Sequence, residues 1–258
     1  MNRLETRPAK KGIHSSGLRT MGMLILLVGL AGRSLIQLKM LGVGQLSTEE
    51  LLAVMQGSQE AVILTCFALL IQAMETCAAP IFCFLLVEGV THTGSFGKYF
   101  VRVLGLALLS EIPYNLAWNG TVLFTGSRNP VFGMVLCLAL LYVYRRFQDK
   151  GFKNAAIMVT ATLSAVLWGG MLKITGGSCC VILVAVLWLF RKKPIYRTLF
   201  GCMAAASCSM LSPFFLLSPL GFIGIRFYNG EKGPGNRIVN YLAYPVMLLA
   251  AGLAIKFL

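Results

Sequence analysis

Charged side chains are scarce in this sequence, and acidic ones are far fewer than basic ones. Only 12% of the 258 residues are charged, with 9 Asp and Glu against 23 Lys and Arg, whereas 57% are hydrophobic. A soluble domain of this length could not bury so much apolar surface. The composition therefore excludes an ordinary soluble enzyme and indicates an integral membrane protein.

Motifs for metal and nucleic-acid binding are also missing. The chain has two histidines, and its eight cysteines lie in or beside apolar runs without the two-residue spacing of a zinc knuckle. We therefore expect no metal site and interpret the cysteines as small buried hydrophobes. The net charge of +14 comes without a platform of interleaved aromatic and basic residues, so we expect no nucleic-acid partner.

Long apolar runs recur along the whole chain. A helix that crosses a hydrocarbon layer of ~30 Å needs roughly 20 largely uncharged residues, and about nine runs approach that requirement. No cleavage pattern follows the first run, so we expect it to remain as an uncleaved span. We predict an all-α polytopic bundle with the lipid bilayer as its partner, divided into a basic cytoplasmic segment, 1–20, and a single transmembrane helical domain, 21–258. The runs fall approximately at 21–40, 61–90, 99–118, 131–144, 155–172, 179–190, 199–211, 214–225 and 238–257.

The basic residues alternate between the connections of these runs. Short cytoplasmic loops accumulate Lys and Arg, so the richer connections are expected inside. The pattern predicts a multi-pass protein of the bacterial inner membrane with a cytoplasmic amino terminus. The inside connections carry Lys98, Arg102, Arg145, Arg146, Lys150, Lys153, Arg191, Lys192, Lys193, Arg197, Arg226, Lys232 and Arg237, and the outside ones carry Lys39, Arg128, Lys173 and Lys256.

The ionisable residues that lie deepest in the predicted spans are Arg33, Glu75 and Glu111. Such groups are costly at membrane depth and usually face the interior of a bundle. One explanation is structural, with Arg33 paired to Glu75 or Glu111 so that helices are held together. The other is functional, with a polar cavity that opens toward one face.

Around Glu111 the sequence is unusual for a membrane span. If the helix continues through Pro113, the proline removes one backbone donor and crowds the carbonyl of Leu109. Glu111 and Asn115 are one turn apart and share a helical face. The pattern favours a kinked helix that carries a polar site, which includes Ser110.

A second polar pair, Glu88 and His92, lies one turn apart at the predicted cytoplasmic edge of the second run. The pair could simply end a helix, or it could be an acid and base that face a cytosolic substrate. We expect the other histidine, His14, to be solvent-exposed and without a role.

Two separate blocks of this sequence resemble the TraX family. The resemblance implies a polytopic inner-membrane protein that transfers an acetyl group from acetyl-coenzyme A to an amine, such as a pilin amino terminus. A small-molecule acceptor is the other option. The matching residues are Glu88-Gly89, His92-Thr93, Lys98-Tyr99 and Ser110-Glu111-Ile112-Pro113 in the first block, and Tyr228-Asn229-Gly230, Gly233 and Tyr244-Pro245 in the second.

The sequence departs from the family pattern at several positions that could exchange protons. Gly29 and Leu30 stand where the family has an Asp-His pair, and Met247 stands where it has a late His. Thr76 and Thr175 replace an expected Arg and Asp. We therefore assign the candidate catalytic groups as His92, Glu88 and Glu111, and the candidate substrate-binding groups as Arg33, Ser110, Asn115, Tyr228 and Asn229.

Three functional hypotheses follow. The first is a membrane acyltransferase that uses a coenzyme A thioester from the cytosol. The second is a catalytically degenerate relative that binds a lipid or a protein partner. The third is a small-molecule transporter with Glu111 in its path, for which paired broken helices in an inverted repeat would be expected, and the sequence shows no such repeat.

Overall fold

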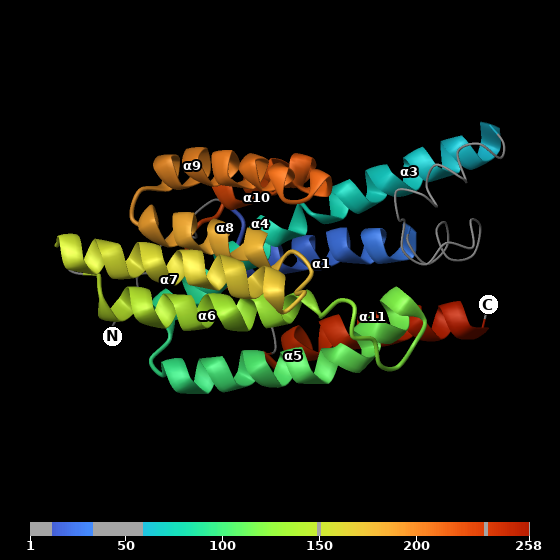
Figure 1. The fold of residues 1–258 in the computed structure, drawn as a ribbon, viewed down its shortest axis with the longest axis horizontal. Helices are drawn as coiled ribbons and strands as arrows, with labels where there is room; N and C mark the ends of the chain where they lie inside the picture. Colours follow the sequence, from blue (N-terminus) through green and yellow to red (C-terminus); the bar gives the residue numbers. More distant parts are fainter. Residues whose placement is uncertain (1–11, 33–58, 149–150, 235–236, 258) are drawn as a thin grey trace, which may run out of the picture.

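The computed structural model describes residues 12–32, 59–148, 151–234 and 237–257, and these form an elongated bundle of helices (Figure 1). The all-α fold class predicted from the sequence is confirmed. The helices are α1 (Ser15–Gly32), α3 (Gln59–Glu75), α4 (Ala78–His92), α5 (Phe96–Asn119), α6 (Pro130–Arg146), α7 (Phe152–Met171), α8 (Gly177–Leu189), α9 (Pro194–Ser207), α10 (Gly221–Arg226) and α11 (Arg237–Phe257), with 3₁₀ segments η2 (Cys208–Met210) and η3 (Pro213–Leu220).

Four helical stretches in the described part are long and apolar enough to cross a membrane. They are α1, the consecutive helices α3 and α4, α5 and α7. Shorter apolar helices add to them, but α8 with its 13 residues is only about 20 Å long, less than the ~30 Å of a hydrocarbon layer. The described residues thus hold four full-length candidates and several shorter helices, where the sequence predicted about nine spans.

The apolar run at 61–90 was predicted as one span, but it is divided between α3 and α4. Pro80 explains the break, because its ring crowds the carbonyl four residues earlier, at Thr76. The break is held by η3, since Thr76 Oγ1 donates to the Phe214 carbonyl at 2.9 Å and Cys77 Sγ to the Leu217 carbonyl at 3.0 Å. The side-chain donors at this break in the helix therefore find backbone acceptors inside the bundle.

The two short runs at 199–211 and 214–225 also form interrupted helices. α9 begins earlier than predicted, at Pro194, and η2 and η3 separate it from the six residues of α10. Pro213 and Pro219 lack the backbone donors that a regular helix would need here. Gly221 lets this region approach the α3–α4 break, because a Cβ there would lie 2.2 Å from the Cys77 carbonyl oxygen.

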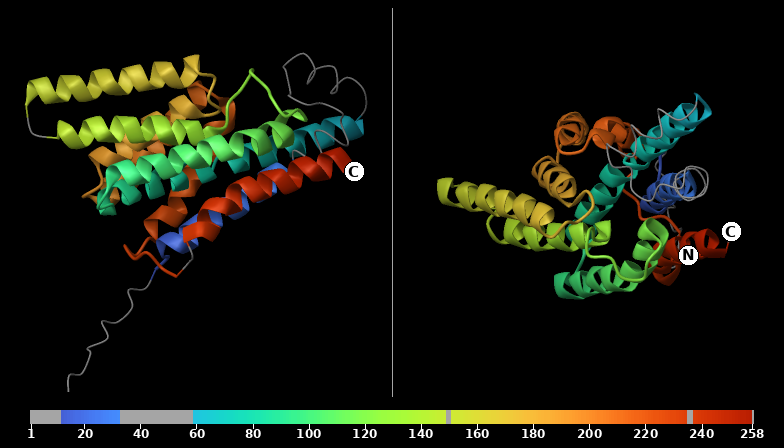
Figure 2. Two further views of the ribbon diagram at one scale, coloured as in Figure 1. Left: turned by 90° about the horizontal axis from the view of Figure 1, so that it is seen from below. Right: turned by 45° about the vertical axis from the view of Figure 1, so that its right-hand side comes forward.

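α4 and α8 form the centre of the bundle, and α1, α6, α7, α9 and α10 pack against one or both of them (Figure 2). Most side chains of α8 are buried, including Val181, Leu183 and Leu187. α5 continues through Pro113 and pairs extensively with α11. Six of the eight cysteines are buried as predicted, whereas Cys66 is exposed on the outer face and Cys202 is half-buried.

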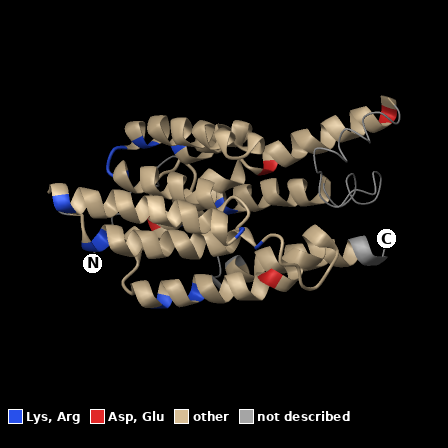
Figure 3. Cartoon of the chain, viewed as in Figure 1, with Lys and Arg blue, Asp and Glu red and all other residues tan. Residues whose placement is uncertain are grey.

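Most of the described lysines and arginines gather at one end of the bundle, to the left in Figure 3. This end carries the α4–α5, α6–α7 and α8–α9 connections, where the sequence placed its basic clusters. The other ends of α5, α6, α7 and α8 carry the α5–α6 and α7–α8 connections, in which Arg128 and Lys173 are the basic residues described. The bundle therefore has one basic end, called the basic end below.

Candidate functional site

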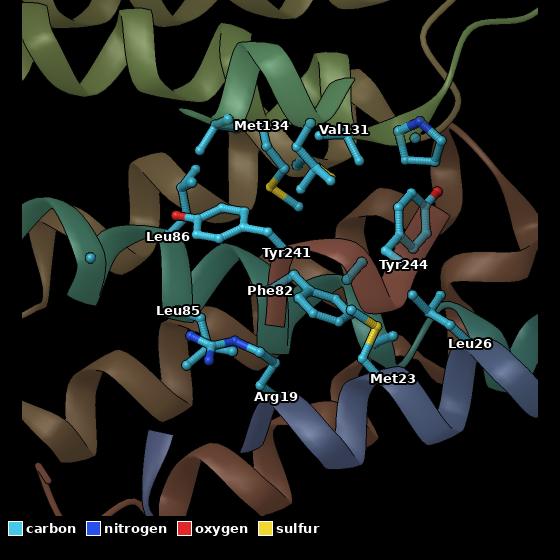
Figure 4. Close-up of a pocket in the computed structure, with 18 of the residues that line it drawn as sticks. Arg19, Met23, Leu26, Phe82, Leu85, Leu86, Val131, Met134, Tyr241 and Tyr244 are labelled. Atoms are coloured by element: carbon cyan, nitrogen blue, oxygen red, sulfur yellow. The ribbon is translucent and has the colours of Figure 1, made fainter. Parts of the chain in front are cut away.

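A cavity of about 770 Å³ runs into the bundle between α1, α4, α5, α6 and α11. Figure 4 shows side chains from α1, α4, α6 and α11 converging on it. The wall is mainly apolar and extends along α1 from Arg19 to Leu30, about 16 Å at the helical rise. Its labelled apolar residues include Met23, Leu26, Phe82, Leu85, Leu86, Val131 and Met134.

Basic side chains surround the outer part of this cavity, at the basic end of the bundle. Lys98 and Arg102 come from the first turns of α5, Arg19 from α1 and Lys232 from the connection before α11. Lys98, Arg102 and Lys232 are exposed and Arg19 is half-buried. We call these four residues the basic mouth.

His92 also lines the cavity at the basic mouth. Its ring nitrogen Nδ1 lies 2.9 Å from the backbone carbonyl oxygen of Glu88 and 3.4 Å from Glu88 Oε2. With the proton on Nδ1 donated to that carbonyl, Nε2 carries the lone pair. The imidazole side chain is 70% exposed, so Nε2 is available to a ligand in the mouth.

Glu88 itself turns toward a neighbouring cluster behind the cavity wall. Tyr228 donates its hydroxyl to Glu88 Oε2 at 3.5 Å, and Arg197 Nη1 lies 4.0 Å from Glu88 Oε1. The guanidinium of Arg197 stacks over Phe84 at 4.6 Å from the ring centroid. Burial, and then the Glu88 carboxylate, raise the pKa of Tyr228 to about 12, so the phenol stays a hydrogen-bond donor at neutral pH.

His14, which we expected to be solvent-exposed and without a role, is half-buried and contacts two residues of the connection before α11. Its Nδ1 lies 3.0 Å from Asn229 Nδ2 and 3.4 Å from Glu231 Oε2. Backbone bonds join the same segments, from Ile13 N to the Phe227 carbonyl at 2.8 Å and from Asn229 N to the Ile13 carbonyl at 3.0 Å. Asn229, a predicted substrate-binding residue, thus holds the chain before α1 against the connection before α11.

Asn129 organises a second polar cluster around the predicted residues Ser110 and Glu111. Its side-chain nitrogen donates to Ser110 Oγ at 2.8 Å, and its backbone N–H donates to Glu111 Oε2 at 3.2 Å. Its side-chain oxygen accepts from Tyr244 at 3.1 Å and from Val131 N at 3.0 Å, where it caps α6. This fully buried asparagine therefore ties α5, α6 and α11 together.

The inner end of the cavity combines hydroxyl groups with apolar side chains. Tyr114 and Thr175 share a hydrogen bond of 2.8 Å between their hydroxyls. Leu30 packs in a small apolar cluster with Met247, and both line the cavity. Glu75 also lines this end and packs directly against Gly29. A side chain at position 29 would not fit there, because its Cβ would lie 2.6 Å from Glu75 Cγ.

The predicted site residues therefore fall into two groups. Glu88, His92, Tyr228 and Asn229 lie at the basic end, whereas Ser110, Glu111 and Asn115 lie toward the other end of α5; Lys98 and Glu111 are about 20 Å apart along that helix. Asn115 is 1% exposed, and its Oδ1 has no hydrogen-bond partner among the described residues. Arg33 lies outside the described residues, and so does its predicted pairing with Glu75 or Glu111.

The sequence reasoning missed Asn129 and Arg197. Arg197 was counted only as a basic loop residue, yet it shares the buried face of α9 with Gly201, Ala204 and Ala205. That helical spacing of small residues was a visible signal for an inward-facing arginine. Asn129 directly precedes a helix-starting proline, which is a typical N-cap position, but its long-range partners could not be seen.

The family model described as TraX protein matches residues 51–254, which is most of the chain. This chain belongs to the TraX family. No curated protein and no solved structure matches it significantly. Membership supports a helical membrane protein of the TraX type.

The positions at which we expect the sequence to depart from the TraX pattern lie close together in the fold. Leu30, Thr76, Thr175 and Met247 all line the inner end of the cavity, and Gly29 backs onto Glu75 beside it. The positions are distant in sequence but come together in the fold. The inner end of the cavity therefore collects positions at which the resemblance implied other residues, whereas His92 and Lys98, which match the resemblance, lie at the basic mouth.

Proposed function

We propose that this TraX protein is a multi-pass acyltransferase of the bacterial inner membrane that takes its acyl group from a coenzyme A thioester in the cytosol. The observation that carries the proposal is His92, held by Glu88 at the basic mouth of a deep cavity. The basic end, by the rule that cytoplasmic loops are enriched in Lys and Arg, faces the cytosol, where such thioesters are made. The acceptor is an amine, of a pilin-like protein or a small molecule.

The residues of the mouth suit the proton and charge movements of such a transfer. The amine nitrogen forms a bond to the thioester carbonyl carbon, the C–S bond breaks, and its electron pair leaves with sulfur. His92 Nε2 takes the amine proton and returns it to the thiolate. Lys98 and Arg102 offset the negative charge that develops on the carbonyl oxygen and that the donor phosphates carry.

The Glu88 cluster would act on His92 from behind. The Glu88 backbone carbonyl and carboxylate fix Nδ1 of the imidazole, while Tyr228 and Arg197 fix the carboxylate. Glu88 is thus a positioning residue, because it touches the base and not the cavity.

The test is the release of free coenzyme A by purified protein in lipid nanodiscs, measured by mass spectrometry with acyl thioesters and a primary amine. His92→Ala should lower the rate ~100-fold or more. Glu88→Gln should lower it less and shift the pH profile, while Glu60→Gln, a carboxylate on the exposed start of α3, serves as the matched control and should have no effect. Turnover that is unaffected by His92→Ala would overturn the assignment.

The gathering of the departures at the inner end favours a second candidate, a relative that kept its cavity but lost its catalyst. The same assay distinguishes the two. A Leu30→His and Met247→His variant places two imidazoles at the inner end and leaves Gly29 alone, because Glu75 occupies the adjacent space. Turnover that appears only in this variant would favour a binding role for the natural chain.

A further inference from the structure

The shape and chemistry of the cavity point to a ligand larger than an acetyl group. Its basic mouth, which includes Arg19, opens onto an apolar wall that runs about 10 Å along α1, from Met23 to Leu30. An acetyl group would leave most of that wall without a partner, and water gains no hydrogen bonds there. A cavity of about 770 Å³ is within the range that encloses a whole small ligand.

We infer that this cavity binds one long acyl chain whose head carries phosphate, with the head at the basic mouth and the chain along the apolar wall toward Leu30. The inference rests on the proposed acyl transfer, because it names the class of acyl group that this transfer would use. Two sources share this chemistry: a long-chain acyl thioester of coenzyme A, and a single-chain phospholipid from the membrane.

The wall contacts required by an acyl chain are present on three helices. Met23 and Leu26 from α1 face Phe82 and Leu85 from α4, and Met134 of α6 closes the other side (Figure 4). Methionine side chains are flexible and adapt to chains of different shape. Burial of each methylene in such a wall strengthens binding about fourfold.

The hydroxyl groups of the inner end are compatible with a chain terminus, and the Glu75 carboxyl, which also lines this end, interacts with other groups of the protein. Tyr114 and Thr175 bond each other, and the Tyr244 hydroxyl is bonded to Asn129. These hydroxyls therefore need no partner from the ligand. Leu30, Met247 and Leu248 provide apolar surface beside them.

The mouth distinguishes a phosphorylated head from a neutral one. The cavity-lining residues there include Arg19, Lys98, Arg102 and Lys232 and no carboxylate. Glu88 and Glu231, the nearby acidic residues in the described part, face His92, Arg197 and His14 instead. Each basic residue near a phosphate contributes about fivefold to binding at low salt.

Trp118 makes the position of the chain measurable, because it lines the inner part of the cavity while Trp168 and Trp188 do not. The probes are acyl-coenzyme A and lysophosphatidylglycerol with chains brominated at the terminal carbon, added to the protein in nanodiscs. Bromine at the chain end should quench Trp118 fluorescence, and bromine beside the head should not. Probe dissolved in the lipid can also quench the other tryptophans. Subtracting the quenching measured in Trp118→Phe from that of the natural chain removes this contribution.

Matched variants test the wall and the mouth. Leu26→Phe narrows the cavity and should weaken binding about tenfold or more, whereas Leu24→Phe, on the exposed face of the same helix, should have no effect. Lys98→Gln with Arg102→Gln should weaken binding on the order of twentyfold at low salt. Lys153→Gln with Lys192→Gln, which are exposed outside the cavity, is the charge-matched control.

The arms of the experiment separate the possible outcomes. Tighter binding of the thioester assigns the chain to the acyl donor, and tighter binding of the lysophospholipid assigns it to the membrane lipid. Affinity that does not rise from acetyl to dodecanoyl thioester, or quenching that is as strong in Trp118→Phe as in the natural chain, would overturn the inference. Binding of the long chain without turnover would support the inference and contradict the proposed acyl transfer. Turnover of acetyl-coenzyme A without chain-length dependence would support the acyl transfer and contradict the inference.

Discussion

Arg197 lies in a different environment in the fold from the one that the sequence predicts. In the sequence it belongs to a basic connection, but the residue is only 9% exposed, and its guanidinium lies over the ring of Phe84 and reaches Glu88. A buried carboxylate is tolerated when it has a cation and donors beside it. Arg197 and Tyr228 together keep Glu88 in place behind His92.

The pKa of Tyr228 provides a test of this cluster. It rises from its ordinary value of 10 to about 12 because of burial and then the Glu88 carboxylate. The folded phenol stays protonated while that of the unfolded chain ionises, so its contribution to folding stability is complete below pH 10 and is lost as the pH rises through about 12. We expect Glu88→Gln to lower this pKa toward the ordinary value.

The measurement is the phenolate absorbance as a function of pH, taken as the difference between each protein and its Tyr228→Phe counterpart. Burial remains in Glu88→Gln, so the pKa of Tyr228 should fall without reaching the ordinary value. An unchanged titration after Glu88→Gln would show that the carboxylate does not act on the phenol.

Interrupted elements shape the middle of the bundle. α3 and α4 meet at a break near Pro80, and η3 supplies the carbonyl acceptors for that break. Inside a membrane protein such irregular backbone is stable only where other segments satisfy its polar groups. The break and η3 therefore depend on close contact, which Gly221 permits.

Gly221→Ala tests this contact. The new methyl group would lie 2.2 Å from the Cys77 carbonyl oxygen, so backbone must move. We expect a loss of about 1–3 kcal/mol in the free energy of unfolding, seen as a lower midpoint in thermal unfolding in detergent. Gly105→Ala is the control, because nothing lies within 4 Å of its Cβ position, and it should stabilise α5 by about 0.5–1 kcal/mol. Equal effects of the two substitutions would contradict the close contact.

At the scale of the whole molecule, basic residues are concentrated at one end and the cavity opens among them (Figure 3). Positive charge near a bacterial membrane is retained on the cytoplasmic side. The mouth, the Glu88 cluster and the α6–α7 connection should then share one compartment. The α5–α6 connection should lie in the other.

Cysteine labelling with a membrane-impermeant maleimide tests this orientation in intact cells. Leu123→Cys, 80% exposed in the α5–α6 connection, should be labelled from outside. Gly151→Cys, in the α6–α7 connection, has open space around its Cβ and should be labelled only after the membrane is broken. Labelling of Gly151→Cys in intact cells would reverse the orientation and remove cytosolic access to His92.

The sequence alone determined the all-α class, because long uncharged runs have few alternatives to helices in a membrane. It also identified the family and the local pair Glu88 and His92, since residues one turn apart on a helix meet without help from the rest of the fold. Only the tertiary structure decided that α3 and α4 are separate, that Asn129 joins Ser110, Glu111 and Tyr244, and that Arg197 faces Glu88. These features depend on contacts between distant segments, and hydropathy and spacing along one chain carry no information on which helices become neighbours.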